Sequence, residues 1–300
     1  MKPRRLTSNW NHKAMSLAFL APAILLFALF SWWPIAKSFV ISFQQYSTDP
    51  AVPSRFVGLD NFRQVLVIDG DIALDAWANV LLFVFLGLIV GYIIPIVLAI
   101  AINEMRHANS FFRLAYYLPA ILPLVVVTIM WRYIYTPEDG LLDSMFRAAG
   151  LPSVGWLIHK GTAMLALVIM ATWKGAGATM LIYLAALQGV PSELYEAAEL
   201  DGASIRQRVR HITLPFLMPV MLILLILQVI GTFQIFTEPF IMTKGGPARG
   251  TYTILMYIYD KLFREYNYGA ATAMGLMLFA ALVVLTVIYS RVTRRFSEAR

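Results

Sequence analysis

Residues 76–103 read AWANVLLFVFLGLIVGYIIPIVLAIAIN, a run of 28 positions without a charged side chain. A helix of about 20 apolar residues is long enough to cross a bilayer, in which the backbone must satisfy its own hydrogen bonds. The run is therefore predicted to be a membrane span. The whole chain agrees with this, since 59% of its 300 residues are hydrophobic and only 14% are charged. Soluble domains usually carry about 25% charged residues, so that class is excluded.

Outward from this run, five further stretches are free of charged residues or nearly so. The six predicted spans cover approximately residues 14–36, 76–103, 114–131, 161–190, 212–237 and 266–290. The third is the shortest, and the fourth is interrupted only by Lys174. The predicted fold is an all-α polytopic membrane protein with six transmembrane helices, in a single membrane domain over residues 1–300.

The distribution of basic residues predicts the orientation. One set of connecting segments and termini holds 13 Lys or Arg in 54 positions, and the opposite set holds 10 in 96. The richer set comprises residues 1–13, 104–113, 191–211 and 291–300. Because cytoplasmic segments are enriched in Lys and Arg, both termini are predicted to be cytoplasmic. The net charge of +7 thus reflects membrane topology, and no nucleic-acid partner is expected.

Glycine and proline within the spans bear on how the helices meet. Gly87 and Gly91 form a GxxxG pattern, which lets another helix approach the second span closely. Pro119 and Pro123 lie in the third span, where neighbouring helices can satisfy the carbonyl groups that proline frees.

Several kinds of chemistry are absent from the sequence. There are no cysteines, and the four histidines are scattered without acidic partners at ligand spacing, so no metal site is expected. No segment reads GxxxxGK[ST], the phosphate-binding loop of many ATPases. We therefore expect no catalytic residues, no cofactor and no ATP hydrolysis by this chain. Transport, a channel or a structural membrane role remain.

Residues 191–214, PSELYEAAELDGASIRQRVRHITL, form the predicted cytoplasmic loop between the fourth and fifth spans. Ser192 can cap a first short helix and Gly202 can stop it. Ser204 followed by Gln207 is a capping box for a second helix. From the residues alone, this segment is either an interfacial helix on anionic lipid or a docking element for a partner.

The loop resembles the EAA loop of the permease subunits of binding-protein-dependent ABC importers. The matching residues are Glu196-Ala197-Ala198, Asp201-Gly202-Ala203, Ile212, Leu214 and Pro215. Further matches to maltose-type sugar permeases lie outside it, at Phe56 to Phe62, Phe111 to Arg113, Leu118-Pro119, Pro123, Trp131 and Thr243 to Pro247. Val209 departs from the pattern, because the family usually has an aromatic residue there.

The resemblance implies a type I importer permease fold in the bacterial inner membrane, with a cytoplasmic coupling helix. It implies a second permease subunit in a heterodimer, two ATP-binding subunits that bind ATP and magnesium, and an extracytoplasmic solute-binding protein. The implied coupling residues are Glu196, Ala197, Ala198, Asp201 and Gly202. Glu196 would pair with a basic residue of the ATPase, the alanines would allow close packing, and Gly202 would supply the turn.

A substrate site is predicted on the fourth and fifth spans. Gln228, Thr232 and Ile235 fall on one face of a helix, where amide and hydroxyl groups can bind a sugar or join two helices. Lys174 is an ionisable residue well inside a span, which is a functional hypothesis by default. The resemblance implies that Lys174, Gly175, Ala178, Gln228, Thr232 and Ile235 contact substrate. Lys174 is also compatible with an anionic sugar.

The function predicted from sequence is that of a permease subunit of an ATP-driven importer for a sugar or oligosaccharide. The alternative within this class is a permease for another solute, such as glycerol phosphate, an amino acid or a polyamine. A self-sufficient secondary carrier would need buried acidic residues for ion coupling, and Lys174 is the one charge that the predicted spans contain.

Overall fold

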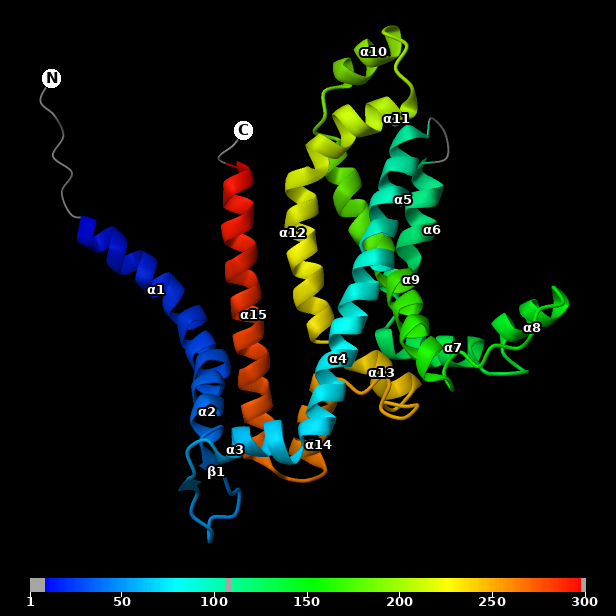
Figure 1. The fold of residues 1–300 in the computed structure, drawn as a ribbon. Coiled ribbons are helices and arrows are strands. Elements are labelled where there is room, and N and C mark those ends of the chain that lie inside the picture. The colour runs from blue at the N-terminus through cyan, green and yellow to red at the C-terminus, as the bar shows by residue number, and fades with distance from the viewer. Residues whose placement is uncertain (1–8, 106–108, 298–300) are drawn as a thin grey trace, which may run out of the picture.

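The computed structural model describes residues 9–105 and 109–297, which are almost entirely helical (Figure 1). Five helical segments are long and apolar enough to cross a membrane: Met15–Ile41, Gly70–Glu104, Lys160–Leu187, Ile205–Met242 and Tyr268–Thr293. A sixth crossing exists if the bent pair Ser110–Ile121 and Leu124–Ile134 is counted as one. The predicted all-α membrane fold is confirmed, with a third span that differs from a simple helix.

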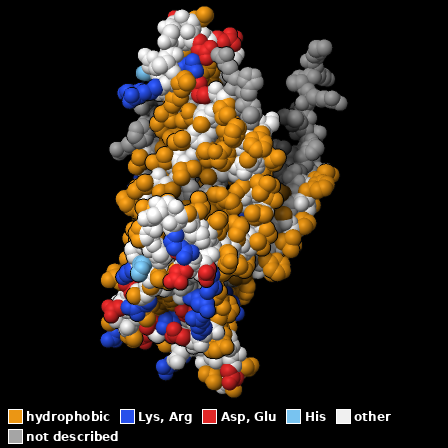
Figure 2. Space-filling view, turned by 90° about the vertical axis from the view of Figure 1, so that its right-hand side faces the viewer, with side chains coloured by type: hydrophobic (Ala, Val, Ile, Leu, Met, Phe, Trp, Pro, Cys, Tyr) orange, Lys and Arg blue, Asp and Glu red, His pale blue; other side chains and the backbone are white. Residues whose placement is uncertain are grey.

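The surface of the molecule is divided into zones of different polarity. In Figure 2, hydrophobic side chains form a broad band across the middle of the visible face, and charged side chains gather towards its two ends. Large apolar side chains of the spans face outward, including Phe19 at 81% and Val284 at 57% exposure. Such a surface is unfavourable in water and suits a lipid environment.

The first span lies apart from the other helices. It consists of α1 (Asn9–Phe27), a π-helical turn η1 (Ala28–Trp32) and α2 (Trp33–Ile41). Its contacts with the rest of the chain are concentrated at α2, where Phe39 meets Phe279 edge-on at 6.1 Å between ring centroids. None of its apolar window is buried inside the chain.

The second span packs against both the fourth and the fifth spans. It consists of α4 (Gly70–Leu86), the π-helical turn η3 (Gly87–Gly91) and α5 (Ile93–Glu104). A β-carbon at Gly91 would lie 3.2 Å from both Thr172 of the fourth span and Gln228 of the fifth. The close approach predicted from the GxxxG pattern is therefore confirmed.

The third predicted span, 114–131, is two helices rather than one. These are α6 (Asn109–Ile121) and α7 (Leu124–Ile134), and they meet at an angle of 98°. The break falls at Leu122 and Pro123, because proline lacks an N–H group and disfavours helical geometry in the residue before it. At 1.5 Å per residue, α6 is about 20 Å long, shorter than a hydrocarbon core of about 30 Å.

A long helix lies at each of the last three predicted spans. They are α9 (Lys160–Leu187), α12 (Leu214–Phe233) and α15 (Tyr268–Ser297). The fifth helix ends at Phe233, so the predicted stretch 212–237 extends past its true end. Between α9 and α12 lie α10 (Ser192–Leu200), α11 (Ile205–Arg208) and the π-helical turn η4 (Val209–Thr213).

Short elements occupy the other end of the bundle, which we call the α14 end. They are β1 (Gln44–Gln45), β2 (Arg55–Phe56), α3 (Asp60–Arg63), η2 (Gln64–Ile68), α8 (Leu141–Ala148), α13 (Thr237–Met242) and α14 (Ile254–Phe263). The strands are antiparallel, with Gln44 opposite Phe56. In Figure 1 the start of α1 and the end of α15 lie on the same side of the bundle as α10, opposite α14.

The segment around α8 is organised by one buried carboxylate. Asp143 is 1% exposed, and its two oxygens accept hydrogen bonds from the N–H groups of Glu138 at 2.8 Å and Val154 at 3.2 Å. Arg147 lies 3.8 Å away as an ion pair. A hydrogen bond from Ser153, more than any other contact, lowers the pKa of Asp143 below its usual range.

Asp143→Asn is expected to loosen residues 135–159, because the amide keeps only one of the two acceptor oxygens that Glu138 and Val154 need. Amide hydrogen exchange should become faster at both N–H groups. Since the pKa of Asp143 is lowered in the folded state, its carboxylate stabilises this segment at pH values above the unfolded pKa of about 3.9. That contribution is lost as the pH falls through the folded pKa. Low pH should therefore also make amide exchange faster at the N–H groups of Glu138 and Val154.

Asp139→Asn is the matched control, because Asp139 is exposed and its side chain has no partner in the described part of the chain. Equal exchange rates in the two variants would contradict the role of Asp143.

Candidate functional site

A cavity of about 270 Å³ lies between the second, fourth and fifth spans. Its polar lining is provided by Thr172, Thr179, Gln228 and Thr232, and Phe83 adds an aromatic ring. None of the described residues that line it is charged. The lining residues come from the middle of the second and fourth spans and from the second half of α12, so the cavity lies between membrane-spanning helices.

Gln228 fixes the wall of this cavity. Its Nε2 donates to the carbonyl oxygen of Gly87 at 2.8 Å, at the start of η3. The absent side chain at Gly91 leaves room for the amide, as described above. The Oε1 of Gln228 and the hydroxyl of Thr172 have no partner among the described residues, so both can bind a ligand.

The structure brings together three of the six predicted substrate residues. Gly175, Gln228 and Thr232 line the cavity. Ala178 does not line it, and Ile235 is 6% exposed in an apolar cluster just beyond the end of α12. Whether any of these residues contacts substrate remains a prediction.

Lys174 also lies away from the cavity. Its ammonium group donates to the carbonyl oxygens of Leu122 at 2.9 Å and Ala120 at 3.2 Å. These carbonyls are at the end of α6, where the turn at Pro123 removes their helical partners. The lysine therefore satisfies a broken helix end, and its charge is not directed at the cavity.

Thr172 and Thr179 were not among the predicted site residues. Together with Gly175 they fall at positions i, i+3 and i+7 of α9, which places them on one helix face. That spacing was visible in the sequence. The resulting surface offers hydroxyl and amide groups beside an aromatic ring, without a fixed charge, and suits a neutral polyhydroxylated ligand.

A second candidate site is the short helix α10. It ends in a Schellman motif, in which the N–H of Gly202 donates to Glu199 O at 3.0 Å and that of Ala203 to Ala198 O at 2.8 Å. Gly202 has φ +75°, a conformation that favours glycine. On the opposite side, the hydroxyl groups of Tyr195 and Thr213 are 3.0 Å apart and hold α10 to η4.

One face of α10 and α11 is open to solvent, and we call it the α10 surface. It comprises Leu194, Glu196, Ala197, Leu200 and Ile205. Leu200 is 89% exposed and Ile205 57%, unusually high values for large apolar side chains at a polar end of the bundle. Of the other predicted coupling residues, Asp201 and Gly202 are exposed and Ala198 is half-buried.

The caps of the two loop helices are only partly as predicted. Gln207 Oε1 accepts the N–H of Ser204 at 2.7 Å, and the capping box of α11 is confirmed. Ser192 is the first residue of α10 rather than its cap, which is Pro191. The prediction for Ser192 was wrong, because the proline before it already sets the helix start.

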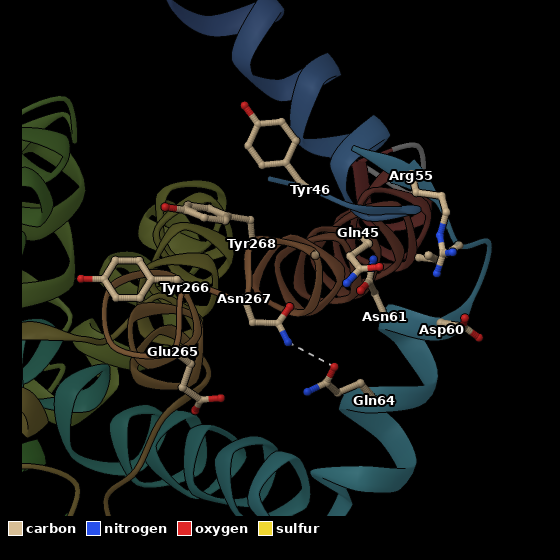
Figure 3. Close-up of a pocket in the computed structure, with 12 residues that line it drawn as sticks. Gln45, Tyr46, Arg55, Asp60, Asn61, Gln64, Glu265, Tyr266, Asn267 and Tyr268 are labelled. Carbon is tan, nitrogen blue, oxygen red and sulfur yellow. Dashed lines mark hydrogen bonds between the residues drawn. The ribbon is translucent and has the colours of Figure 1, made fainter. Parts of the chain in front are cut away.

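At the α14 end, a polar pocket of about 390 Å³ opens between the β1–β2 hairpin and the α14–α15 loop (Figure 3). Tyr46, Tyr266 and Tyr268 lie on one side of it, and Asn267 donates to Gln64 at 3.1 Å across its floor. Tyr266 is 69% exposed with φ +54°, a strained conformation for a tyrosine.

Glu265, which lines this pocket, belongs to a group of ion pairs. Lys261 Nζ is 2.9 Å from Asp69 Oδ2 and 2.6 Å from Glu265 Oε2, and Tyr257 donates to Asp69 at 2.7 Å. Burial lowers the pKa of Lys261, but the hydrogen bonds to Glu265 and Asp69 outweigh it and leave the pKa raised. The ammonium group is therefore charged at neutral pH and joins α14 to the start of the second span.

The comparison with protein families identifies the kind of molecule that carries these sites. Residues 84–298 match the family described as binding-protein-dependent transport system inner membrane component. This chain belongs to that family. The match includes the α10 surface and every residue that lines the cavity except Phe83, so both sites of this permease lie almost wholly within the family match.

Relatives of this permease include named sugar transporters. It is 31% identical to the arabinooligosaccharides transport system permease protein AraP of Halalkalibacterium halodurans, over 99% of this chain and 93% of that protein. It is 30% identical to the trehalose/maltose transport system permease protein MalF of Thermococcus litoralis, over 96% and 97% of the two chains.

The fold of this permease is also that of solved importers. A bacterial ABC transporter involved in the import of the acidic polysaccharide alginate has a chain that superposes with a TM-score of 0.84 at 26% identity, covering 97% of this chain and 99% of that one. That transporter has also been solved with an alginate pentasaccharide-bound periplasmic protein. The likeness to the MetNI methionine transporter, with a TM-score of 0.51 at 18% identity, concerns the fold alone.

Proposed function

We propose that this permease forms half of the translocation pathway of an ATP-driven importer for a sugar or oligosaccharide. The observation that carries the proposal is the α10 surface, an exposed apolar and acidic face on a helix whose end is fixed by a Schellman motif. The sugar class is supported by the relatives named for arabinooligosaccharides and for trehalose and maltose. The uncharged, hydroxyl-rich cavity suits the same ligands.

In this proposal the α10 surface sits in a groove of a cytoplasmic ATPase subunit. Glu196 makes the ionic contact, Ala197 and Ala198 allow close packing, and Asp201 and Gly202 complete the turn. A short helix with fixed ends moves as one body and can pass the closure of two ATPase subunits to the spans. The ATPases bind and hydrolyse ATP, and this chain is not itself an enzyme.

The assembly has a second permease chain, two ATPase subunits and an extracytoplasmic binding protein. Both termini and α10 are cytoplasmic, and the α14 end meets the binding protein. The first span, which is unburied within its own chain, has a surface available for the second permease. We place the complex in the bacterial cytoplasmic membrane and the two permeases in a heterodimer.

The test is to purify the tagged chain from its native membrane with everything that remains bound. We expect an ATPase, a second permease and a binding protein, and the ligand of that binding protein identifies the sugar. Reconstituted in liposomes, the complex should take up this sugar only with ATP on the cytoplasmic side. Uptake by the chain alone, driven by an ion gradient, would overturn the proposal.

Gln228→Ala and Thr232→Ala are expected to weaken the apparent affinity for the sugar by about fivefold to tenfold each, the loss of one or two hydrogen bonds. Uptake rates at several sugar concentrations measure this directly. Gln228→Ala should be the more severe, since it also removes one of the two hydrogen bonds that the carbonyl of Gly87 accepts, the other coming from the N–H of Tyr92. Gly175 lines the same cavity, whereas Lys174, Ala178 and Ile235 do not line it and stay predicted contacts from the family resemblance alone.

Thr286→Ala is the matched control for Thr232→Ala. Both hydroxyls donate to the carbonyl four residues earlier in their own helix, at 2.9 Å for Thr232 and 2.8 Å for Thr286. Thr286, however, is exposed on α15. An unchanged affinity in both cavity variants would exclude this cavity as the sugar site.

A further inference from the structure

The side chain of Arg208 joins two parts of the chain that are far apart in sequence. Arg208 is the last residue of α11, and its side chain is only 12% exposed. Its Nη2 donates to Glu104 Oε2 at 2.6 Å, and its Nη1 donates to Glu199 Oε1 at 2.9 Å. Glu104 is the last residue of α5, and Glu199 belongs to α10. One guanidinium group therefore links α10 to the end of the second span.

This link is unlike the surroundings of the neighbouring arginines. Arg206 and Arg210 are exposed, and neither has an ion-pair partner in the part of the chain that the structure describes. The carboxylate of Glu104 is 16% exposed, so its pair with Arg208 is largely shielded from water. Exposed pairs are screened by water and weak, so the shielded pair with Glu104 is the stronger half of the link, and the pair with Glu199, whose side chain is 49% exposed, is the weaker half.

The second span extends from this link to the cavity. From Glu104 it runs through α5 to η3, where the carbonyl of Gly87 accepts the amide of Gln228. π-Helical turns inside α-helices occur frequently at functional sites. At the far end, Asp69 precedes α4 and is held by Lys261 at 2.9 Å. The span is thus fixed by ionic contacts at both ends, with an irregular turn beside the cavity between them.

We propose that Arg208 is a positioning residue that transmits a displacement of α10 to the second span and so to the cavity. The inference rests on the proposed function, in which an ATPase subunit moves α10. Because Asp69 holds the far end, a displacement at Glu104 is taken up along the span, and η3 is the turn best able to bend. The carbonyl of Gly87 and the amide of Gln228 then shift, and the cavity changes shape.

The test uses the complete complex in liposomes, with ATP hydrolysis and sugar uptake measured on the same preparation. Arg208→Gln is expected to keep ATP hydrolysis while the sugar transported per ATP falls on the order of fivefold or more. Glu104→Gln should give the same uncoupling. The double variant should be no worse than Arg208→Gln alone, because Arg208→Gln already removes the pair with Glu104 that Glu104→Gln removes. Arg206→Gln is the matched control and should transport normally.

A second measurement follows the link itself. The chain has no cysteines, so spin labels at Glu193→Cys on α10 and Ala101→Cys on α5 are the only two in this subunit. We expect the distance between these labels to stay constant when ATP is added to the otherwise native complex. In the Arg208→Gln variant, adding ATP should broaden or change this distance. A residue that is important only for folding would not produce a change that depends on ATP.

The outcomes separate this inference from the proposed function. Normal coupling in Arg208→Gln or Glu104→Gln, with Glu196→Lys inactive, overturns the inference alone. Normal uptake in Glu196→Lys overturns the coupling role of α10, and the inference with it. If Arg208→Gln fails to assemble, the sugar transported per ATP is measured in Glu104→Gln and Arg208→Lys instead, since both variants keep most of the packing. A label distance that changes with ATP in the native complex also overturns it.

Discussion

Replacing Glu196 by lysine is expected to reduce ATP-driven uptake by about tenfold or more, while the inserted amount of protein stays unchanged. Glu196 is exposed on α10 and has no ion-pair partner in the described residues, so the fold does not depend on its charge. In the proposed assembly its carboxylate faces a basic group of the ATPase. A lysine there puts two like charges together, which costs several kcal/mol, and about 1.4 kcal/mol is a factor of ten.

The measurement is uptake into liposomes, with co-purification of the ATPase as a second readout. Asp139→Lys is the control, because it makes the same charge reversal at an exposed site in the loop between α7 and α8. Gly202→Asp disturbs the same surface through its backbone, at φ +75°, and should have a smaller effect because aspartate tolerates this region better than most residues. Native uptake in both Glu196→Lys and Gly202→Asp would refute the coupling role.

The parts of the fold that sequence predicted well depend on local rules. Charge-free length identifies α9 and α15, and glycine spacing predicts the close approach at Gly91. The capping box at Ser204 needs only four consecutive residues. Each of these signals is complete within one segment, so no knowledge of neighbouring helices is required.

The bent third span shows where such reasoning stops. Counting uncharged residues measures composition and not direction, so 114–131 was predicted as one span although Pro123 turns it by 98°. In the sequence, Pro123 predicts carbonyl groups without helical partners, and Lys174 is a charge inside a span with no visible partner. The structure shows that the two belong together, since the lysine satisfies Leu122 and Ala120. A contact across more than fifty residues is not visible in either segment alone.

The candidate site divides in the same way. The helix face of Gln228 and Thr232 follows from spacing, and both residues do line the cavity. Ile235 is three residues further on, but α12 ends at Phe233, so helical spacing no longer applies to it. Residue spacing therefore predicts which side chains share a helix face, but it does not predict the residue at which the helix ends.

Gly177→Ala is expected to destabilise the permease by about 3 kcal/mol or more, because a single methyl group would prevent α6 and α9 from meeting. A β-carbon at Gly177 would overlap the backbone carbonyl of Tyr116 and lie 2.9 Å from the nitrogen of Tyr117. Backbone atoms cannot rotate aside, so the two helices must separate. Lys174 is one turn away on α9, and the separation would also pull its ammonium group from the carbonyls of α6.

Thermal unfolding of the purified permease measures the effect, and Gly161→Ala is the matched control on the same helix. Nothing lies within 4 Å of a β-carbon at Gly161, so that substitution should be neutral or stabilise the helix by up to about 1 kcal/mol. Both variants add one methyl group to α9, so the difference between them reports mainly the contact with α6. Equal stability of the two variants would mean that α6 does not approach α9 at Gly177. The hydrogen bonds from Lys174 to the end of α6 would then also be contradicted.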